Sequence, residues 1–164
     1  MCFIHFGYSQ NVLFIGNKTY PSTDPFILKS NKEWDGFDLN VSIAKMEESA
    51  IIVLSANVFD CYVRIYGKIL IYLEDGNVIT CIDRAKFDCV DGKTTTLYSL
   101  NKTEINQLKI SNIHTIRFSL KCVGCISSSA EGDYSVSNNG NQEGNLKKEK
   151  ANVPNLIENL FSNI

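Results

Sequence analysis

The most reactive groups in this 164-residue chain are its six cysteines. Cys122 and Cys125 have the CxxC spacing that is typical of zinc sites and of dithiol redox motifs. A zinc site needs a second pair of ligands, and Cys81 and Cys89 are too widely spaced to match it. A redox motif stands at the start of a helix, whereas this one follows an expected strand. We therefore expect structural cysteines, bridged or as thiols, and one option is a bridge between Cys81 and Cys89.

Nucleophilic catalysis by cysteine needs a base, and His114 is the only histidine after residue 10. The sequence contains no GxSxG, HExxH, GxGxxG or Walker A pattern. A small cysteine-dependent enzyme or redox protein that uses a cysteine with His114 therefore remains the alternative function. We assign no catalytic residue, and we expect neither a metal nor a cofactor.

A second group of residues is suited to binding rather than to catalysis. Trp34 stands in a polar turn segment, where an aromatic ring can stack on a sugar or anchor a peptide. The spacing of the aspartates around residues 83–91 differs from that of a calcium loop, and the other interpretation is a long connection between two strands with Asp91-Gly92 as its turn. Arg117 alternates outward on an expected strand, so it would join a site only by converging with Arg84. The candidate binding residues are Trp34, Arg84, Asp88, Asp91 and Arg117, and the aromatic residues Tyr66 and Tyr72 are further options.

The composition limits the class of partner. The formal net charge is −2, so there is no basic excess to neutralise nucleic-acid phosphates. No segment approaches the length of apolar sequence that a transmembrane helix requires. A protein or glycan partner is compatible with this composition.

Most of the body has the short-period apolar pattern of strands. Residues 39–44 alternate between apolar and polar, as a half-buried strand requires. Residues 50–54 are continuously apolar and rich in β-branched side chains, which is typical of a central strand. Residues 61–65, 94–98 and 115–121 are the other expected strands.

The clearest local signal is the segment KILIYLEDGNVITCID (68–83). Its Asp75-Gly76 pair tolerates positive φ and predicts a two-residue hairpin turn. The register then pairs Leu73 with Val78 and, at the open end, Lys68 with Asp83 as an ion pair. The core face of this hairpin should hold Ile69, Ile71, Leu73, Val78, Thr80 and Ile82.

One short helix is expected at about residues 102–110. Asn101 and Glu104 resemble a capping box, with asparagine in the place of serine or threonine. The absence of repeated strand–helix alternation argues against a parallel doubly wound sheet. We therefore expect a mainly β, β-rich α+β fold, with an antiparallel β-sandwich or a rolled sheet and one short helix near 102–110.

The two ends of the chain differ from the body. Residues 1–10 contain no Asp, Glu, Lys or Arg and are interpreted as a signal-peptide remnant, with a first β-strand as the alternative. Residues 11–125 form the expected single β-rich domain. Residues 126–164 are polar and are expected to be a flexible tail that ends in a short amphipathic helix. This helix should dock on its own domain or on a partner.

The segments YLEDGNVITCIDR (72–84) and TTLYSLNKTEINQLKISNIHTIRFSLKC (95–122) resemble small exported domains of Gram-negative bacteria. The resemblance implies a periplasmic, envelope-associated or secreted location, and it carries over no catalytic residue. The function expected from the sequence is therefore an exported, non-catalytic β-domain that serves as a binding or interaction module of the cell envelope.

Overall fold

The computed structural model describes residues 11–32, 36–143 and 146–162, so the signal-peptide remnant expected at 1–10 lies outside the described residues. These residues form thirteen strands and two helices, which account for most of the described chain. In chain order they are β1 (Asn11–Ile15), β2 (Lys18–Ser22), β3 (Phe26–Ser30), β4 (Leu39–Lys45), β5 (Ala50–Asn57), β6 (Val63–Leu73), β7 (Val78–Cys81), β8 (Phe87–Val90), β9 (Lys93–Leu100), α1 (Lys102–Ile110), β10 (Ile113–Cys122), β11 (Gly132–Ser137), β12 (Asn141–Glu143), β13 (Leu146–Lys148) and α2 (Val153–Ser162).

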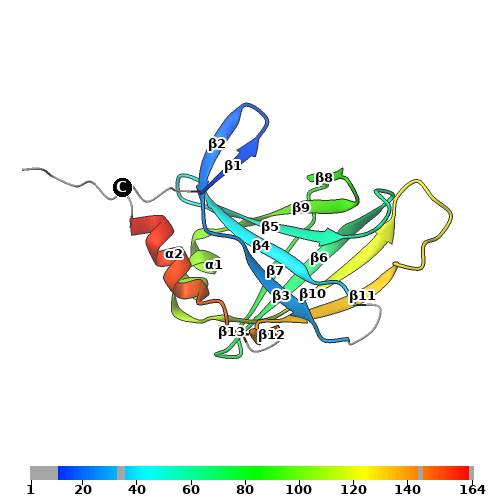
Figure 1. Cartoon of the computed structure of the whole chain (residues 1–164). Coiled ribbons are helices and arrows are strands. Elements are labelled where there is room, and N and C mark those ends of the chain that lie inside the picture. Colours follow the sequence, from blue (N-terminus) through cyan, green and yellow to red (C-terminus); the bar gives the residue numbers. More distant parts are fainter. Residues whose placement is uncertain (1–10, 33–35, 144–145, 163–164) are drawn as a thin grey trace, which may run out of the picture.

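Eleven of the strands belong to one sheet, whose main order is β7-β6-β10-β11-β3-β4-β5-β9-β8. All of its pairings are antiparallel, and the β1–β2 hairpin attaches to β4 through β2. The sheet curls over on itself, so that β6 and β10 face β4 and β5 across the core (Figure 1). The strand order does not return to its first member, and the roll stays open. The prediction of a mainly β fold with a rolled antiparallel sheet is therefore confirmed.

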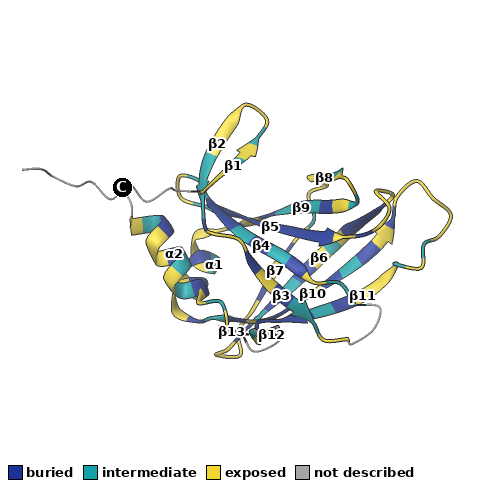
Figure 2. Ribbon diagram, viewed as in Figure 1, coloured by how far each residue is buried: buried dark blue, intermediate teal, exposed yellow. Residues whose placement is uncertain are grey.

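The core lies between the two halves of this roll. Buried side chains from both halves form one continuous cluster, which includes Ile52 and Leu54 on β5 and Ile69 and Ile71 on β6. All four are fully buried. β5 is buried along almost its whole length, as its continuous apolar sequence predicts for a central strand (Figure 2).

The open line of the roll runs where β9 passes β6, and side chains rather than a backbone ladder connect these strands. The Tyr98 hydroxyl donates a hydrogen bond to the Gly67 carbonyl at 3.0 Å. The Thr96 hydroxyl donates to the Ile65 carbonyl at 3.3 Å. We call this line the seam. Burial raises the pKa of the Tyr98 phenol, so the hydroxyl keeps its proton and remains a donor.

Further contacts surround the seam. The buried Arg64 guanidinium on β6 lies 4.1 Å from the centroid of the Phe87 ring on β8, and its Nη1 is 3.5 Å from Asp83 Oδ2. A disulfide joins Cys61, just before β6, to Cys89 on β8. The aromatic ring and the disulfide therefore tie β6 to β8, at the far end of the strand order.

The two helices pack against each other at one end of the roll (Figure 1). α1 has the predicted bounds, and both hydrogen bonds of its Asn101–Glu104 capping box are present. α2 buries Val153, Ile157 and Leu160 in the same core cluster. Burying each of these side chains stabilises the docked helix by about 1.5–3 kcal/mol.

The expectation of a flexible tail at 126–164 is wrong for β11, whereas the short helix expected at the end of the tail is present as α2. β11 lies inside the sheet, where it pairs with β10 on one side and with β3 on the other. The domain therefore continues past residue 125 and includes α2. Polarity misled the prediction, because an antiparallel strand needs apolar side chains on one face only. Tyr134 and Val136 alone supply that face in β11.

A buried asparagine fastens the segment before α2. The Asn138 side chain donates hydrogen bonds to the carbonyls of Ile113 and Ala151 at 3.1 and 2.9 Å, and it accepts one from the Ala151 amide at 2.9 Å. Asn112 also reaches this segment, because its Oδ1 accepts a hydrogen bond from the Val153 amide at 3.1 Å. These bonds fix the start of α2 relative to β10.

The predicted register of the β6–β7 hairpin is wrong by one residue. Tyr72, rather than Leu73, pairs with Val78, because the loop holds three residues instead of two. Gly76 takes a φ of +88°, and the Asp75 carboxylate accepts hydrogen bonds from the backbone and side chain of Asn77. These bonds also hold the pKa of the Asp75 carboxyl below its usual range.

The shift of register reverses the faces of β7. Ile79 and Cys81 point into the core, whereas Val78 and Ile82 are 44% and 71% exposed. The expected ion pair between Lys68 and Asp83 does not form, because Asp83 pairs with Arg64. The core positions on β6 are as predicted.

We expect Tyr98→Phe to lower the free energy of unfolding by about 1–2 kcal/mol, because the buried Gly67 carbonyl loses its donor at the seam. Urea denaturation measures this loss. Tyr62→Phe is the matched control: this side chain is 58% exposed, and its loss should stay below about 0.5 kcal/mol. Equal effects of the two substitutions would contradict the role of the seam.

Asn138→Ala should lower the free energy of unfolding by about 1–3 kcal/mol, since several buried polar groups lose their partner. Hydrogen exchange should show the α2 amides losing protection first. The neighbouring Asn139 is exposed, and Asn139→Ala should change neither quantity. Unchanged α2 exchange in Asn138→Ala would show that the helix is held by its apolar face alone.

Candidate functional site

The candidate site begins with an irregularity in β6. β6 and β10 pair at Leu70↔Arg117 and again at Tyr66↔Ser119. Between these two pairs, β6 contains two more residues than β10. Gly67 lies in this bulge with a φ of +75°, a conformation that side chains other than glycine rarely adopt. Its amide donates to Asp83 and its carbonyl accepts from Tyr98. Both backbone groups therefore hold the bulge in place.

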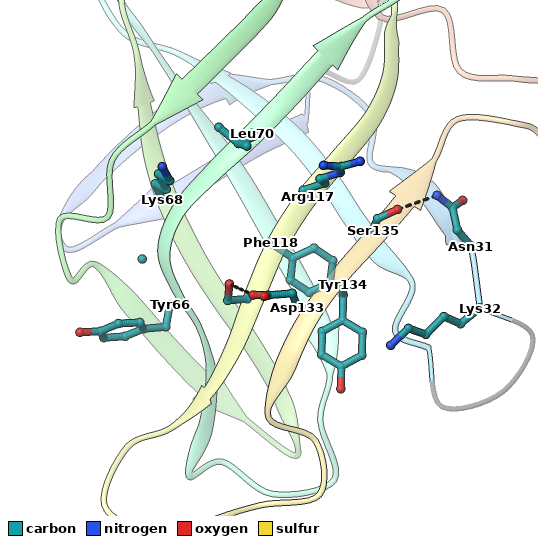
Figure 3. Close-up of a pocket in the computed structure, with 12 residues that line it drawn as sticks. Asn31, Lys32, Tyr66, Lys68, Leu70, Arg117, Phe118, Asp133, Tyr134 and Ser135 are labelled. Carbon is teal, nitrogen blue, oxygen red and sulfur yellow. Dashed lines mark hydrogen bonds between the residues drawn. The ribbon is translucent and has the colours of Figure 1, made fainter.

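The bulge opens a hollow of about 550 Å³ on the outer face of the sheet. It extends from β6 across β10 and β11 to the end of β3 (Figure 3). The register places Leu70, Arg117 and Ser135 in one row across three strands, and Tyr66, Ser119 and Asp133 in a second row. We call this surface the outer face.

The polar side chains of the two rows are already hydrogen bonded. Asn31 Nδ2 donates to Ser135 Oγ at 2.6 Å, and the Ser119 hydroxyl donates to Asp133 Oδ1 at 2.5 Å. Both bonds are drawn in Figure 3. The Asp133 carboxylate is thereby engaged by a hydroxyl on its own face.

Tyrosine rings orient the cations of the outer face. The Arg117 guanidinium lies 5.0 Å from the centroid of the Tyr72 ring, and Lys121 Nζ lies 4.8 Å from that of Tyr66. Both distances fall in the range of cation–π attraction. Tyr66 is itself 41% exposed, so part of its ring is open to solvent.

The charge of the outer face is one-sided. The hollow is lined by the exposed cations Lys32, Lys68 and Arg117 and by one carboxylate, Asp133. Lys121 lies beside Tyr66, and the exposed Glu131 accepts a hydrogen bond from the neighbouring Cys122 amide. Among the described residues, ion pairs join Lys29 to Asp38, Arg64 to Asp83 and Lys150 to Glu74, and none includes a cation of this face. These cations are therefore available to a ligand.

Of the five candidate binding residues, Arg117 lines this hollow, and so does Tyr66, one of the two further aromatic options. Asp88 lines a second hollow of about 550 Å³, between the β1–β2 hairpin and the β8–β9 strands. Arg84 is exposed in the connection between β7 and β8. Neither hollow is lined by Arg117 together with Arg84 or Asp88, so the structure does not join these candidates in one of the two hollows. Trp34 lies outside the described residues.

Asp91 has a structural position. With Gly92 it forms the two-residue turn between β8 and β9, in which both residues take positive φ, +51° and +73°. This geometry is that of a type I′ hairpin turn. The sequence prediction of a turn at this pair agrees with it.

The cysteines pair differently from the option considered first. Cys89 is bridged to Cys61 rather than to Cys81, and Cys122 is bridged to Cys125. Cys81 is the free cysteine of the described residues. Cys81 pairs with Ile69 between β7 and β6, and its side chain is buried in the core. The spacing of the cysteines along the chain could not show that this thiol has no disulfide partner.

The free thiol is poorly suited to attack a substrate. Burial, together with the nearby Glu104 carboxylate, raises the pKa of the Cys81 thiol to about 12. His114 is exposed, and its Nδ1 lies 2.8 Å from the Thr115 hydroxyl. Within the described part of the chain, no cluster of three or more His, Cys, Asp or Glu is arranged to hold a metal ion.

Sequence reasoning missed Lys68, Lys121 and the polar residues of β11. The signal for the β6 residues was present, because Tyr66, Lys68, Leu70 and Tyr72 alternate with the core positions. The contribution of β10 and β11 depends on a strand pairing with residues that were expected to form a tail.

Comparison with protein-family models, with curated proteins and with solved structures finds no match to this chain. Neither helix of the described residues is long and apolar enough to cross a membrane. The candidate site therefore has to be interpreted from its own geometry.

In a Cys2→Ser variant, which leaves only the cysteines placed above, we expect no reaction of the folded, oxidised protein with a thiol reagent at pH 8. The raised pKa keeps Cys81 protonated, because the thiolate forms only as the pH approaches about 12. Denaturant without reductant should then expose one thiol, and Cys81→Ala should remove it. A reactive thiol in the folded state would contradict the buried position of Cys81.

Proposed function

We propose that this protein is an exported, non-catalytic binding module that holds a partner, a glycan or a protein, on its outer face. The observation that carries the proposal is the group of exposed cations beside the tyrosine rings on the outward surface of β6, β10 and β11, and none of these cations forms an ion pair among the described residues. β10 is paired with a neighbouring strand on each side and is therefore a rigid support. Side chains on such a strand keep their positions before a ligand binds.

The export part of the proposal is supported by the disulfides. Disulfide bonds persist in oxidising compartments and are rare where cellular thiols stay reduced. Two of them are present in the described residues, and one ties β8 to the segment before β6. This chemistry supports the proposal of a periplasmic, envelope-associated or secreted location.

The alternative, a cysteine-dependent enzyme or redox protein with His114, has one specific feature in its favour. The Cys122–Cys125 pair has dithiol spacing, and Cys125 is exposed in the loop that follows β10. Reduction of this pair by a dithiol donor, followed by an activity that depends on His114, would favour it over the binding module.

The binding proposal is tested with two matched double variants. Tyr66→Ala/Arg117→Ala alters the outer face, whereas Phe14→Ala/Lys93→Ala removes an aromatic ring and a cation from the second hollow. The probes are neutral oligosaccharides, acidic oligosaccharides, peptidoglycan fragments and unstructured peptides, with affinity measured by calorimetry.

We expect at least one class of probe to bind, with a loss of tenfold or more in the outer-face variant and little change in the second-hollow variant. Thermal unfolding checks that both variants remain folded. The opposite pattern would move the site to the second hollow. Failure of all the probes to bind would contradict the proposal.

A further inference from the structure

We propose that the outer face binds an acidic oligosaccharide, whose uronic-acid carboxylates pair with Arg117 and the neighbouring lysines. The inference rests on the proposed function and names the ligand class for the same surface. Three properties of the face carry it: its charge, the fixed position of its arginine, and the pairing of its middle strand, β10, on both sides.

The first property is electrostatic. Three cations and one carboxylate line the hollow of the outer face, although the chain as a whole has a formal charge of −2. The cations are therefore gathered here rather than spread evenly over the molecule. The carboxylate, Asp133, is already hydrogen bonded to Ser119. A ligand that complements this face is negatively charged.

The second property is the fixed position of the Arg117 guanidinium before a ligand binds. Its guanidinium rests 5.0 Å from the Tyr72 ring centroid, which limits the rotamers that it samples. The guanidinium fork matches the two oxygens of a carboxylate in a bidentate pair. Ser135 lies beside Arg117 in the same row, and Asn31 donates a hydrogen bond to Ser135. The hydroxyl and amide groups of these two residues suit sugar hydroxyls.

The third property distinguishes a sugar from a peptide strand. A peptide that adds to a sheet needs an unpaired strand edge. At Arg117, β10 pairs with β6 on one side and with β11 on the other, whereas β11 pairs with β3 only through Val136 and Ser137. A ligand centred on Arg117 therefore contacts side chains rather than a strand edge, and an acidic oligosaccharide with many hydroxyls fits this kind of contact.

The dimensions of the face match a chain of several sugars. Tyr66 and Tyr72 stand at the two ends of the exposed row on β6, up to roughly 20 Å apart along the strand. Between them, the half-buried Leu70 and the exposed part of Tyr66 offer apolar surface to the C–H side of a sugar ring. Lys68 and Lys121 stand on either side of Tyr66 in the exposed rows.

The test uses isothermal titration calorimetry of the full chain with tetrasaccharides of galacturonate, mannuronate and alternating glucuronate–N-acetylglucosamine. The fully methyl-esterified galacturonate tetrasaccharide is the matched ligand control, because it keeps the ring and loses the charge. A hexaglutamate peptide represents the acidic-peptide alternative.

We expect at least one acidic tetrasaccharide to bind, and its affinity to fall with rising salt. Arg117→Ala should weaken binding by tenfold or more, and Arg117→Lys should restore only part of it, since the charge returns without the fork. Lys102→Ala, on α1, is the matched control for loss of a cation and should leave affinity unchanged. Amide shifts of Gly67 and Arg117 should report the occupied face.

Three results would overturn this inference: no binding by any acidic tetrasaccharide, equal binding of the methyl ester, or tighter binding of hexaglutamate. If a neutral glycan or a peptide binds and the outer-face variant loses it, the acidic-sugar inference fails while the proposed function stands. If the outer-face variant loses affinity for none of the probes, both fail.

Discussion

The hydrogen bond from the Tyr98 hydroxyl to the Gly67 carbonyl connects the fold to the site. A rolled sheet that does not close leaves backbone groups unpaired along its open line, and buried unpaired groups are costly. Here Tyr98 and Thr96 take the place of a backbone ladder. Because Gly67 is also the bulge residue of β6, the bond that holds the roll together shapes the hollow on its outer face.

The same region explains why a charged side chain is tolerated inside the protein. Arg64 is 7% exposed, and among the described residues its Nε and Nη1 have no hydrogen-bond partner. Stacking of its planar guanidinium on Phe87, with Tyr66 on β6 4.9 Å away, replaces much of the lost hydration. The nearby Asp83 carboxylate balances the charge and also accepts from the Gly67 amide. Arg64 thus belongs to the support of the bulge.

The sequence predicted the elements whose evidence is local. The α1 capping box, the Asp91-Gly92 turn and the continuous apolar run of β5 depend on neighbouring residues, and each is found as expected. Features that depend on distant partners were missed. The register of β7 depends on the hydrogen bond between Asp75 and Asn77 in the hairpin loop. The Cys61–Cys89 disulfide joins residues that are 28 positions apart. β11 is a strand because it pairs with β10 and β3. Arg117 was chosen for its type, but its row could be recognised only across three strands.

The place of β11 has a consequence for how the chain is assembled. This strand comes late in the sequence, yet it lies between β10 and β3 in the middle of the sheet. Until it is made, β3–β4–β5–β9–β8 and β7–β6–β10 are two separate ladders, each with an unpaired strand at the edge that β11 will occupy. Such edges are prone to pair with other molecules, and pairings distant in sequence form slowly. β11 therefore joins the two half-sheets, and it can do so only after this late segment of the chain has been synthesised.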